Sequence, residues 1–398
     1  MAFRESCRME ERVRMLSDYD LNQWSVSELC ERYGISRETF YVWKARRSEG
    51  DAAWFADRSH ARKTVLNRTP GDVVDQIVEL RRRFPHLGPR KLLAVRAREG
   101  DASDWPSAST IGDILVREGL VAKTRRRRRA LDAPRREIDV DTANQEWAAD
   151  YKGWFRTRDQ TRIDPLTITD SCTRFLLETW ITPQTVTGAM AGFTRAFEAY
   201  GLPGAIRCDN GSPFGSAASP GGLTRLSVWW LKLGIEPHFI RPASPQENGR
   251  HERMHRTLKA QTSRPPAANA AGQQLRFDEF RLHYNEIRPH EALGQVPPAQ
   301  IYVPSPRQLP AKLEDPWYDA DHQVRRVRHD GTIKWRGEYI FIGEALSGEC
   351  VGLSELDTGD HAVCFVDHDL GILERIGRFR RFAPPRTRLR QAAETTKT

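Results

Sequence analysis

Apolar residues recur at helical spacing in the first third of the chain. A capping box at Ser25 and Glu28 opens one helix, Gly34 ends it, and Phe40 and Trp43 lie on one face of the next helix. Helix, glycine-containing turn and helix form the helix-turn-helix pattern. An ordinary helical hairpin is the structural alternative.

The second of these helices would expose side chains suited to base and phosphate contacts. They are Arg37, Thr39, Tyr41, Lys44, Arg46 and Arg47. We therefore predict a helix-turn-helix DNA-binding domain over residues 1–63. A weaker helical pattern begins at Gly88-Pro89 and predicts a small helical domain over residues 64–122. Two such helical units before an arginine-rich linker resemble the DNA-end-binding region of insertion-sequence transposases, which implies that this is a second DNA-binding domain.

The centre of the chain changes to β-branched and apolar runs, which predict an α/β core over residues 140–305. Strands are expected around Asp150 and over residues 166–170, 175–181 and 205–208, with an amphipathic helix over 185–200. Three strands, a crossover helix and a fourth strand match the start of a ribonuclease-H-like mixed sheet. The crossover would make the first and fourth strands neighbours.

Three acids lie in segments that would direct carboxylates to one point. Asp150 lies within the first strand, Asp209 ends the fourth, and Glu252 shares a helix face with Arg256 and Lys259. Two Mg²⁺ (or Mn²⁺) ions prefer such oxygen ligands and promote phosphodiester transfer. We expect the three acids to be catalytic and metal-binding, and the two basic residues to contact DNA phosphates.

These segments resemble the three motifs of the retroviral-integrase-like core of insertion-sequence DDE transposases. They read Trp-Ala-Ala-Asp150-Tyr-Lys, Cys-Asp209-Asn-Gly-Ser and Asn-Gly-Arg-His-Glu252-Arg. Tyr284-Asn285, followed by Arg288-Pro-His-Glu-Ala-Leu, resembles a tail signature of the same family. The resemblance covers about residues 20 to 305.

The family pattern leaves two glutamates as the third acid. Glu247 is nearer to Asp209 in the sequence, as in compact members, but the motif places its acid a few residues after the Asn-Gly pair, at Glu252. The loop-forming residues 215–222 account for the longer spacing. We therefore expect Glu252 to be the ligand and Glu247 to be a first-turn acid favoured by the helix dipole.

Charge supports a polyanionic partner, since the formal net charge of the 398 residues is +9. The densest basic block is Arg125, Arg126, Arg127, Arg128 and Arg129. Such a block is either a solvated linker or a nucleic-acid contact. We expect a basic linker over residues 123–139 that contacts double-stranded DNA.

Beyond residue 315, arginines alternate with apolar residues, which predicts a small basic β-barrel over residues 315–383. Asp330-Gly331 predicts a hairpin turn between the runs 324–328 and 332–336. The polar tail, residues 384–398, is expected to be disordered.

Several other residues are assigned structural roles. His251 and His255 are expected to be exposed on their helix, Asp170 to cap a turn, Asp164 to lie in a loop, and Trp229-Trp230 to pack in a core helix.

The six cysteines are scattered, with no pairing typical of a zinc site. We expect a cytosolic protein with reduced thiols and no membrane segment.

The resemblance implies a DNA transposase, a polynucleotidyl transferase and endonuclease. Such an enzyme would bind the terminal inverted repeats of its element, cleave and join element ends and target DNA, and act as a homo-oligomer, a dimer or higher. Two alternatives remain: a DNA-binding regulator with a spent catalytic core, and a nuclease without strand transfer. The expected fold is therefore multidomain, with all-α helix-turn-helix units, a mixed-sheet core and a C-terminal barrel.

Overall fold

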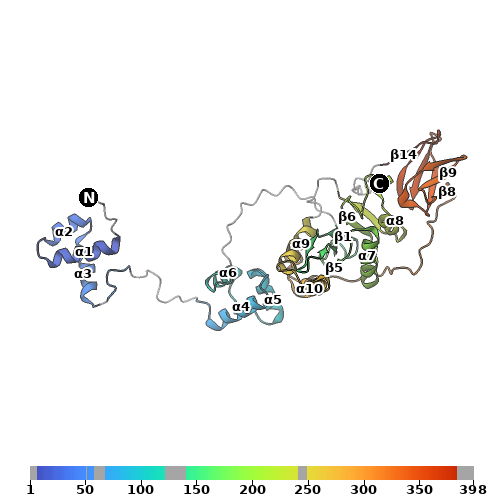
Figure 1. The fold of residues 1–398 in the computed structure, drawn as a ribbon. Coiled ribbons are helices and arrows are strands. Elements are labelled where there is room, and N and C mark those ends of the chain that lie inside the picture. The colour runs from blue at the N-terminus through green and yellow to red at the C-terminus, as the bar shows by residue number, and fades with distance from the viewer. Residues whose placement is uncertain (1–6, 51, 58–67, 122–139, 241–248, 383–398) are drawn as a thin grey trace, which may run out of the picture. The chain divides into compact units, whose positions relative to one another are not determined.

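The computed structural model describes residues 7–50, 52–57, 68–121, 140–240 and 249–382 (Figure 1). The chain divides into two compact units, residues 1–68 and 69–398. Among the described residues, no helix is long and apolar enough to cross a membrane. The expected disordered tail lies outside the described residues.

The first unit contains the predicted helix-turn-helix. Its helices are α1 (Arg8–Asp20), α2 (Val26–Tyr33) and α3 (Arg37–Ser48). The capping box is present, because the Ser25 N–H donates to Glu28 Oε2 at 2.7 Å and the Glu28 N–H donates to Ser25 Oγ at 3.4 Å. Gly34 ends α2 in the left-handed region, at φ 62°. Leu16, Leu29 and Phe40 are fully buried between the helices.

The second unit begins with three further helices, α4 (Gly71–Arg83), α5 (Pro89–Glu99) and α6 (Ala108–Arg117). Gly88 precedes α5 and Pro89 opens it, as the sequence predicts. Ile77, Leu92 and Ile111 form the core of this bundle. The bundle also contacts a π-helical turn, His283–Ile287, where Arg98 Nη2 donates to the Ile287 carbonyl at 2.8 Å.

The predicted mixed sheet has five strands in the order β5-β4-β1-β6-β7. The strands are β1 (Glu146–Tyr151), β4 (Pro165–Asp170), β5 (Leu176–Ile181), β6 (Ala205–Cys208) and β7 (Glu236–Phe239). Pairing is antiparallel from β1 to β5 and parallel from β1 to β7. The strand β7 and the hairpin of β2 (Phe155–Arg156) with β3 (Arg162–Ile163) are additions that the sequence did not predict.

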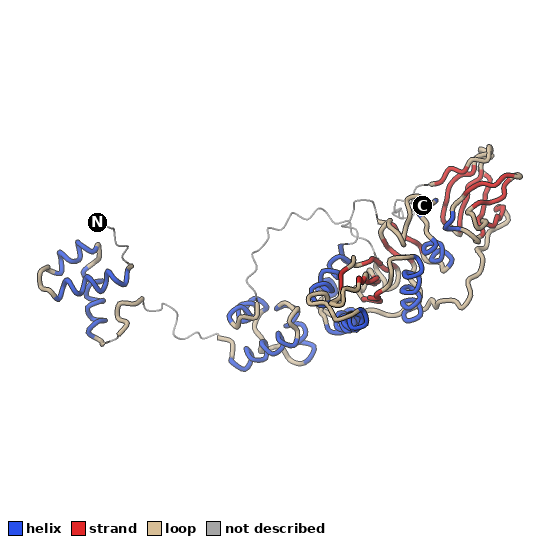
Figure 2. The backbone as a smooth tube through the Cα atoms, in the orientation of Figure 1, coloured by secondary structure: helices blue, strands red, loops and turns tan. Residues whose placement is uncertain are grey.

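Helices cover both faces of this sheet (Figure 2). One face packs on α7 (Val186–Tyr200) and α8 (Arg225–Lys232), with Trp147, Phe193 and Trp230 in the core. The other face packs on α9 (Gly249–Thr262) and α10 (Ala270–Leu282). The fully buried Trp230 confirms the expected core helix.

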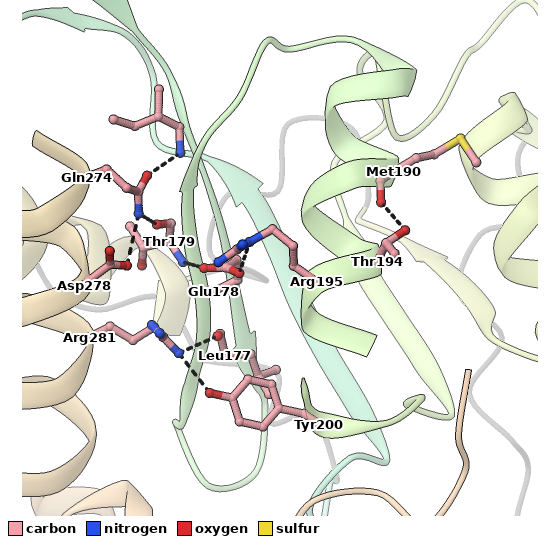
Figure 3. Close-up of polar contacts among 11 residues, drawn as sticks. Leu177, Glu178, Thr179, Met190, Thr194, Arg195, Tyr200, Gln274, Asp278 and Arg281 are labelled. Atoms are coloured by element: carbon pink, nitrogen blue, oxygen red, sulfur yellow. Dashed lines mark hydrogen bonds and ion pairs between the residues drawn. The ribbon is translucent and has the colours of Figure 1, made fainter. Parts of the chain in front are cut away.

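Side chains of α10 cover part of the free edge of β5 (Figure 3). Gln274 Oε1 accepts from the Ile181 N–H at 3.0 Å, and its Nε2 donates to the Thr179 carbonyl at 2.8 Å. Arg281 Nη1 donates to the Tyr200 hydroxyl at 2.9 Å. An edge strand whose backbone groups are already bonded cannot pair with another chain.

The C-terminal part contains a five-stranded antiparallel sheet, in the order β14-β13-β12-β11-β8, and a separate two-stranded sheet. The strands are β8 (His322–Arg326), β9 (Thr332–Trp335), β10 (Glu338–Phe341), β11 (Cys350–Glu355), β12 (His361–Phe365), β13 (His368–Leu373) and β14 (Phe379–Arg381). Closure of these strands into a barrel stays a prediction.

The predicted hairpin at Asp330-Gly331 needs correction. The turn forms, because the Arg328 N–H donates to the Thr332 carbonyl at 2.8 Å, but β8 pairs with β11 and β9 pairs with β10. The hairpin turn is at Arg336-Gly337, where both residues have positive φ, 48° and 90°. Positive φ at both central positions is what a tight hairpin turn of this kind requires.

Candidate active site

The first two acids lie at adjacent ends of parallel strands. Asp150 is on β1, on the face opposite the fully buried Trp147 and Ala149. Asp209 directly follows β6, which pairs in parallel with β1. The Gly211 N–H donates to Asp209 Oδ1 at 3.1 Å and restrains that carboxylate. The crossover through α7 thus brings together two acids that are far apart in the sequence.

The third acid, Glu252, lies in the first turn of α9, and two histidines of the same helix attach it to the sheet. His251 and His255 are 2% and 8% exposed, so the expectation that they are exposed is wrong. His251 Nε2 is 2.7 Å and His255 Nε2 is 2.6 Å from Thr167 Oγ1 on β4. The exposed-helix interpretation failed because α9 packs on the sheet along this face.

The contacts of Thr167 fix the tautomers of both histidines. Its hydroxyl has one proton and two lone pairs. The proton is donated to the Asp150 carbonyl at 3.0 Å, so the two histidine Nε2 atoms must both donate. Burial lowers the pKa of His251 to about 3 and that of His255 to about 2, so both rings are neutral at pH 7. With both rings neutral and protonated at Nε2, the one proton and the two lone pairs of the Thr167 hydroxyl all have hydrogen-bond partners.

The three carboxylates interact electrostatically. Burial and the nearby charges of Asp209 and Glu252 raise the pKa of Asp150 to about 7. Burial also raises the pKa of Asp209, against the hydrogen bond from Gly211. A carboxyl that is buried beside other carboxylates ionises with difficulty unless a cation joins them.

The donor set fits a hard divalent cation, because all three side chains offer oxygen atoms. The neighbouring Cys208 is buried in the core on the other face of the sheet. His255 Nδ1 lies 3.8 Å from Asp150 Oδ2, beyond hydrogen-bond distance. Within the described ranges, no group of three or more His, Cys, Asp or Glu side chains lies close enough to hold a metal ion. Glu247 lies outside the described residues.

Basic side chains border the acids. Burial and the charge of Lys259 lower the pKa of Lys152, while Asp164 and Asp150 raise it. Lys152 therefore lies near both a catalytic candidate and the expected phosphate contact Lys259. Arg256 is exposed on α9. Sequence reasoning missed Lys152, which directly follows β1, two residues after Asp150.

A polar cluster occupies the other end of β1. Arg207 Nη2 donates to Glu146 Oε2 at 2.6 Å, and His238 Nδ1 is 2.8 Å from the same oxygen. Burial lowers the pKa of His238, but hydrogen bonds to Glu146 and Glu236 outweigh it and raise the pKa to about 9. Protonated His238 and Arg207 together neutralise the buried Glu146.

The expected turn cap at Asp170 is present. Its Oδ1 accepts from the N–H and hydroxyl of Thr173, both at 2.7 Å, and its Oδ2 accepts from the Asn144 N–H at 2.7 Å. Asp164 lies in the loop before β4, as expected.

The candidate DNA contacts of α3 have varied surroundings. Lys44 Nζ donates to the Tyr19 hydroxyl at 2.7 Å, and Arg47 forms an ion pair with Asp20 at 2.7 Å, so both hold α3 against α1. Arg46 lies over the Trp43 ring, 4.4 Å from its centroid, and Tyr41 is exposed.

The two remaining candidates lie at the start of α3. Arg37 donates to Ser27, and the Thr39 N–H donates to the N-cap Ser36 at 3.1 Å. Residues 125–129 lie outside the described residues.

Two protein families match separate segments of the chain. Residues 11–63 match a helix-turn-helix domain, and residues 233–298 match the integrase core domain. The second segment includes Glu252 and the Tyr284-Asn285 pair.

Two relatives come from bacterial insertion elements. The transposase InsD of insertion element IS2 from Escherichia coli is 26% identical over 293 residues, which cover 70% of this chain and 90% of that protein. An uncharacterized protein of insertion element IS476 from Xanthomonas euvesicatoria is 27% identical over 232 residues. That match covers 57% of this chain and 63% of the relative, less than two thirds of its length.

Solved structures give weaker likenesses. The catalytic core domain of HTLV-2 integrase, in complex with magnesium, is 15% identical with a TM-score of 0.33 and covers 40% of this chain and 97% of that chain. A chain of the simian T-cell lymphotropic virus intasome is 16% identical with a TM-score of 0.37 and covers 74% and 97%. Because these TM-scores are low, the likeness to known proteins rests on the sequence matches. By those matches, the chain has an integrase core domain and a helix-turn-helix domain and is similar to insertion-element transposases.

Proposed function

We propose that this chain is a DNA transposase that binds the terminal inverted repeats of its own element and cleaves and joins DNA strands. One observation carries the proposal: the partly buried carboxyl of Asp150 is held beside Asp209 and Glu252, and burial together with these two charges raises its pKa to about 7. Three carboxylates in mutual repulsion suit a cation site better than a structural role. We infer that Asp150, Asp209 and Glu252 are the catalytic and metal-binding residues.

Two Mg²⁺ (or Mn²⁺) ions are the proposed cofactors, in keeping with the all-oxygen donor set. When bound, they supply charge neutralisation and Lewis-acid activation for the displacement at phosphorus. The protein's own residues provide the positions. The strands β1 and β6 place two acids rigidly, and the docking of His251 and His255 on Thr167 orients the turn of α9 that carries Glu252.

Lys152, Arg256 and Lys259 are proposed to hold DNA phosphates beside the acids. A cation near a phosphodiester offsets the repulsion between that phosphodiester and the carboxylates. The burial of Lys152 favours this role, since the charge of a partly buried lysine is poorly screened by solvent. Both strand cleavage and strand joining are in-line displacements, so positioning of this kind contributes much of the catalysis.

The remaining parts are proposed to bind double-stranded DNA at element ends and target. We assign a helix-turn-helix domain to residues 1–63, a second helical domain to 64–122, a basic linker to 123–139, the core to 140–305 and a basic C-terminal domain to 315–383. Because an element has two ends, we further propose that a homo-oligomer, a dimer or higher, assembles on the DNA.

The competing function is a DNA-binding regulator. The lack of a metal-ready cluster among the described residues is what favours it. A nuclease that cleaves without joining is the third possibility, which the joining assay below separates from a transposase.

The test is cleavage and joining of a labelled duplex with the element's end sequence, in Mg²⁺. Wild type is expected to cut and join, whereas Asp209→Asn binds the duplex but neither cuts nor joins. Glu252→Gln is expected to be inactive and the matched variant Glu247→Gln active. If Glu247→Gln alone is inactive, Glu247 is the third ligand. If wild type binds the ends but never cuts, the regulator replaces the transposase.

A further inference from the structure

A second basic site lies on the same sheet face as the acids. A cavity of about 30 Å³ lies between β1, β4 and α9 and is lined by Ala148, Thr169, Ser171, Arg174 and Arg250, among others. Ala148 precedes Asp150 by two residues, so both project from the same face of β1, roughly 7 Å apart along the strand. The cavity and the carboxylates are therefore neighbours.

Two guanidinium groups converge at this cavity. Arg174 Nη1 donates to the Ser171 carbonyl at 2.8 Å, and Arg250 Nη1 donates to the same oxygen at 3.4 Å. Each guanidinium has five N–H donors, so most of them are left for another acceptor. Neither arginine forms an ion pair with a carboxylate of the described residues, and like charges held this close repel each other.

The acid in the cavity wall, Asp170, offsets only part of this charge, because its hydrogen bonds go to neutral groups and not to either arginine. Both oxygens of Asp170 are occupied, by Thr173 and by Asn144. The third arginine of the wall, Arg207, is paired with Glu146 at 2.6 Å. Arg174 and Arg250 therefore face one carboxylate, which leaves a net positive charge at the cavity.

The surroundings add further positive charge. Burial and the charges of Arg250 and Arg253 lower the pKa of Arg174 to about 10, against the opposing effects of Tyr284 and Cys172. Desolvated cations that repel one another are stabilised by an anion that binds among them.

We propose that Arg174 and Arg250 form a seat for one phosphate of the DNA backbone, beside the strand that the acids cleave. The guanidinium fork matches the geometry of phosphate oxygens and binds them through paired hydrogen bonds. The cavity has the volume of about one water molecule, so it admits a single phosphate oxygen and not a base. The inference rests on the proposed function, because the ligand is a phosphodiester of the DNA substrate.

The first arm of the test uses inorganic phosphate as the probe on the full chain. The Tm of wild type is expected to rise with phosphate relative to chloride at equal ionic strength. Arg250→Gln, at an exposed position that tolerates substitution, should lose most of the rise, and Arg250→Lys should keep part of it. Arg225→Gln, on the exposed surface of α8, is the matched control and should behave as wild type. Absence of a phosphate-specific rise in wild type overturns the site.

The second arm measures DNA. With Asp209→Asn as the parent chain, so that no substrate is consumed, duplex affinity is measured against salt concentration. Adding Arg250→Gln is expected to lower the slope of log affinity against log salt by about 1, the value for one phosphate contact. The slope could stay unchanged although the first arm shows the phosphate-specific rise in Tm and its loss in Arg250→Gln. In that case the seat binds free phosphate and not DNA, which overturns the DNA assignment. Both arms are read without cleavage, so they stand even if wild type proves inactive as a transposase.

Discussion

The side-chain amide of Asn285 pairs with both backbone groups of Leu176. Its Oδ1 accepts from the Leu176 N–H at 2.8 Å, and its Nδ2 donates to the Leu176 carbonyl at 2.9 Å. An asparagine side chain thus replaces a neighbouring strand at the start of β5. Since Asn285 belongs to the tail signature, part of that signature has a structural reason.

Asn285→Leu is expected to destabilise the second unit by about 1–3 kcal/mol, because two buried backbone groups lose their partners. Urea unfolding followed by circular dichroism measures the loss. Glu286→Gln, at the adjacent exposed position, is the control and should change little. An Asn285→Leu chain as stable as wild type would mean that water replaces the amide at this edge.

Thr167→Val is expected to release α9 from β4, because the hydroxyl that serves both histidines is lost. The two Nε2–H groups would be left buried without acceptors, at about 1–3 kcal/mol each. We expect faster hydrogen exchange in the first turns of α9 and a loss of strand cleavage larger than the loss of overall stability. The control is Thr169→Val, which removes one histidine contact only, at 2.9 Å from His251 Nδ1. Equal effects of the two variants would contradict the idea that the Thr167 hydroxyl, by bonding both histidines, contributes more than Thr169 to the docking of α9.

His238 makes stability depend on pH at the alkaline side. Its pKa is raised from an ordinary 6.5 to about 9 by Glu146 and Glu236. The contribution is therefore complete below about pH 6.5 and is lost as the pH rises through about 9. Its size is about 3 kcal/mol, from a shift in pKa of about 2.5 at about 1.4 kcal/mol for each unit.

The measurement is the free energy of unfolding between pH 6 and pH 10. His238→Gln, which is neutral throughout, should remove most of the dependence over this window. His329→Gln, at an exposed site, is the control and should keep the wild-type profile. A wild-type free energy of unfolding that is constant from pH 6.5 to pH 9 would show that His238 does not lose its proton in this pH range.

Much of the fold could be predicted from local sequence patterns. The capping box at Ser25, the proline at the start of α5 and the strands over 165–170 and 205–208 all follow from short-range signals. The strands β2 and β3 escaped prediction because two residues carry little periodicity, and β7 escaped it because Pro237 and two polar positions argue against a buried strand. Pairing of β8 with β11 also escaped prediction, since no local signal encodes a long-range partner.

The sequence predicted only part of the candidate site. The acids could be identified from their settings, but the burial of His251 and His255 depends on where α9 docks, which helical periodicity alone left open. Lys152 and the convergence of Arg174 with Arg250 on one carbonyl depend on tertiary contacts between separate segments. Residue type and spacing cannot supply these contacts.

The order of the three acids along the chain determines which of them a truncated polypeptide would contain. The helix-turn-helix unit is made first, Asp150 and Asp209 follow, and α9 brings Glu252 later. A polypeptide that stops before α9 therefore keeps the helix-turn-helix unit and lacks Glu252, the third proposed ligand. On the proposed function, premature termination or a frameshift in this interval yields a truncated polypeptide that competes with the full-length chain for the element's ends. Such a product would inhibit transposition of the element that encodes it.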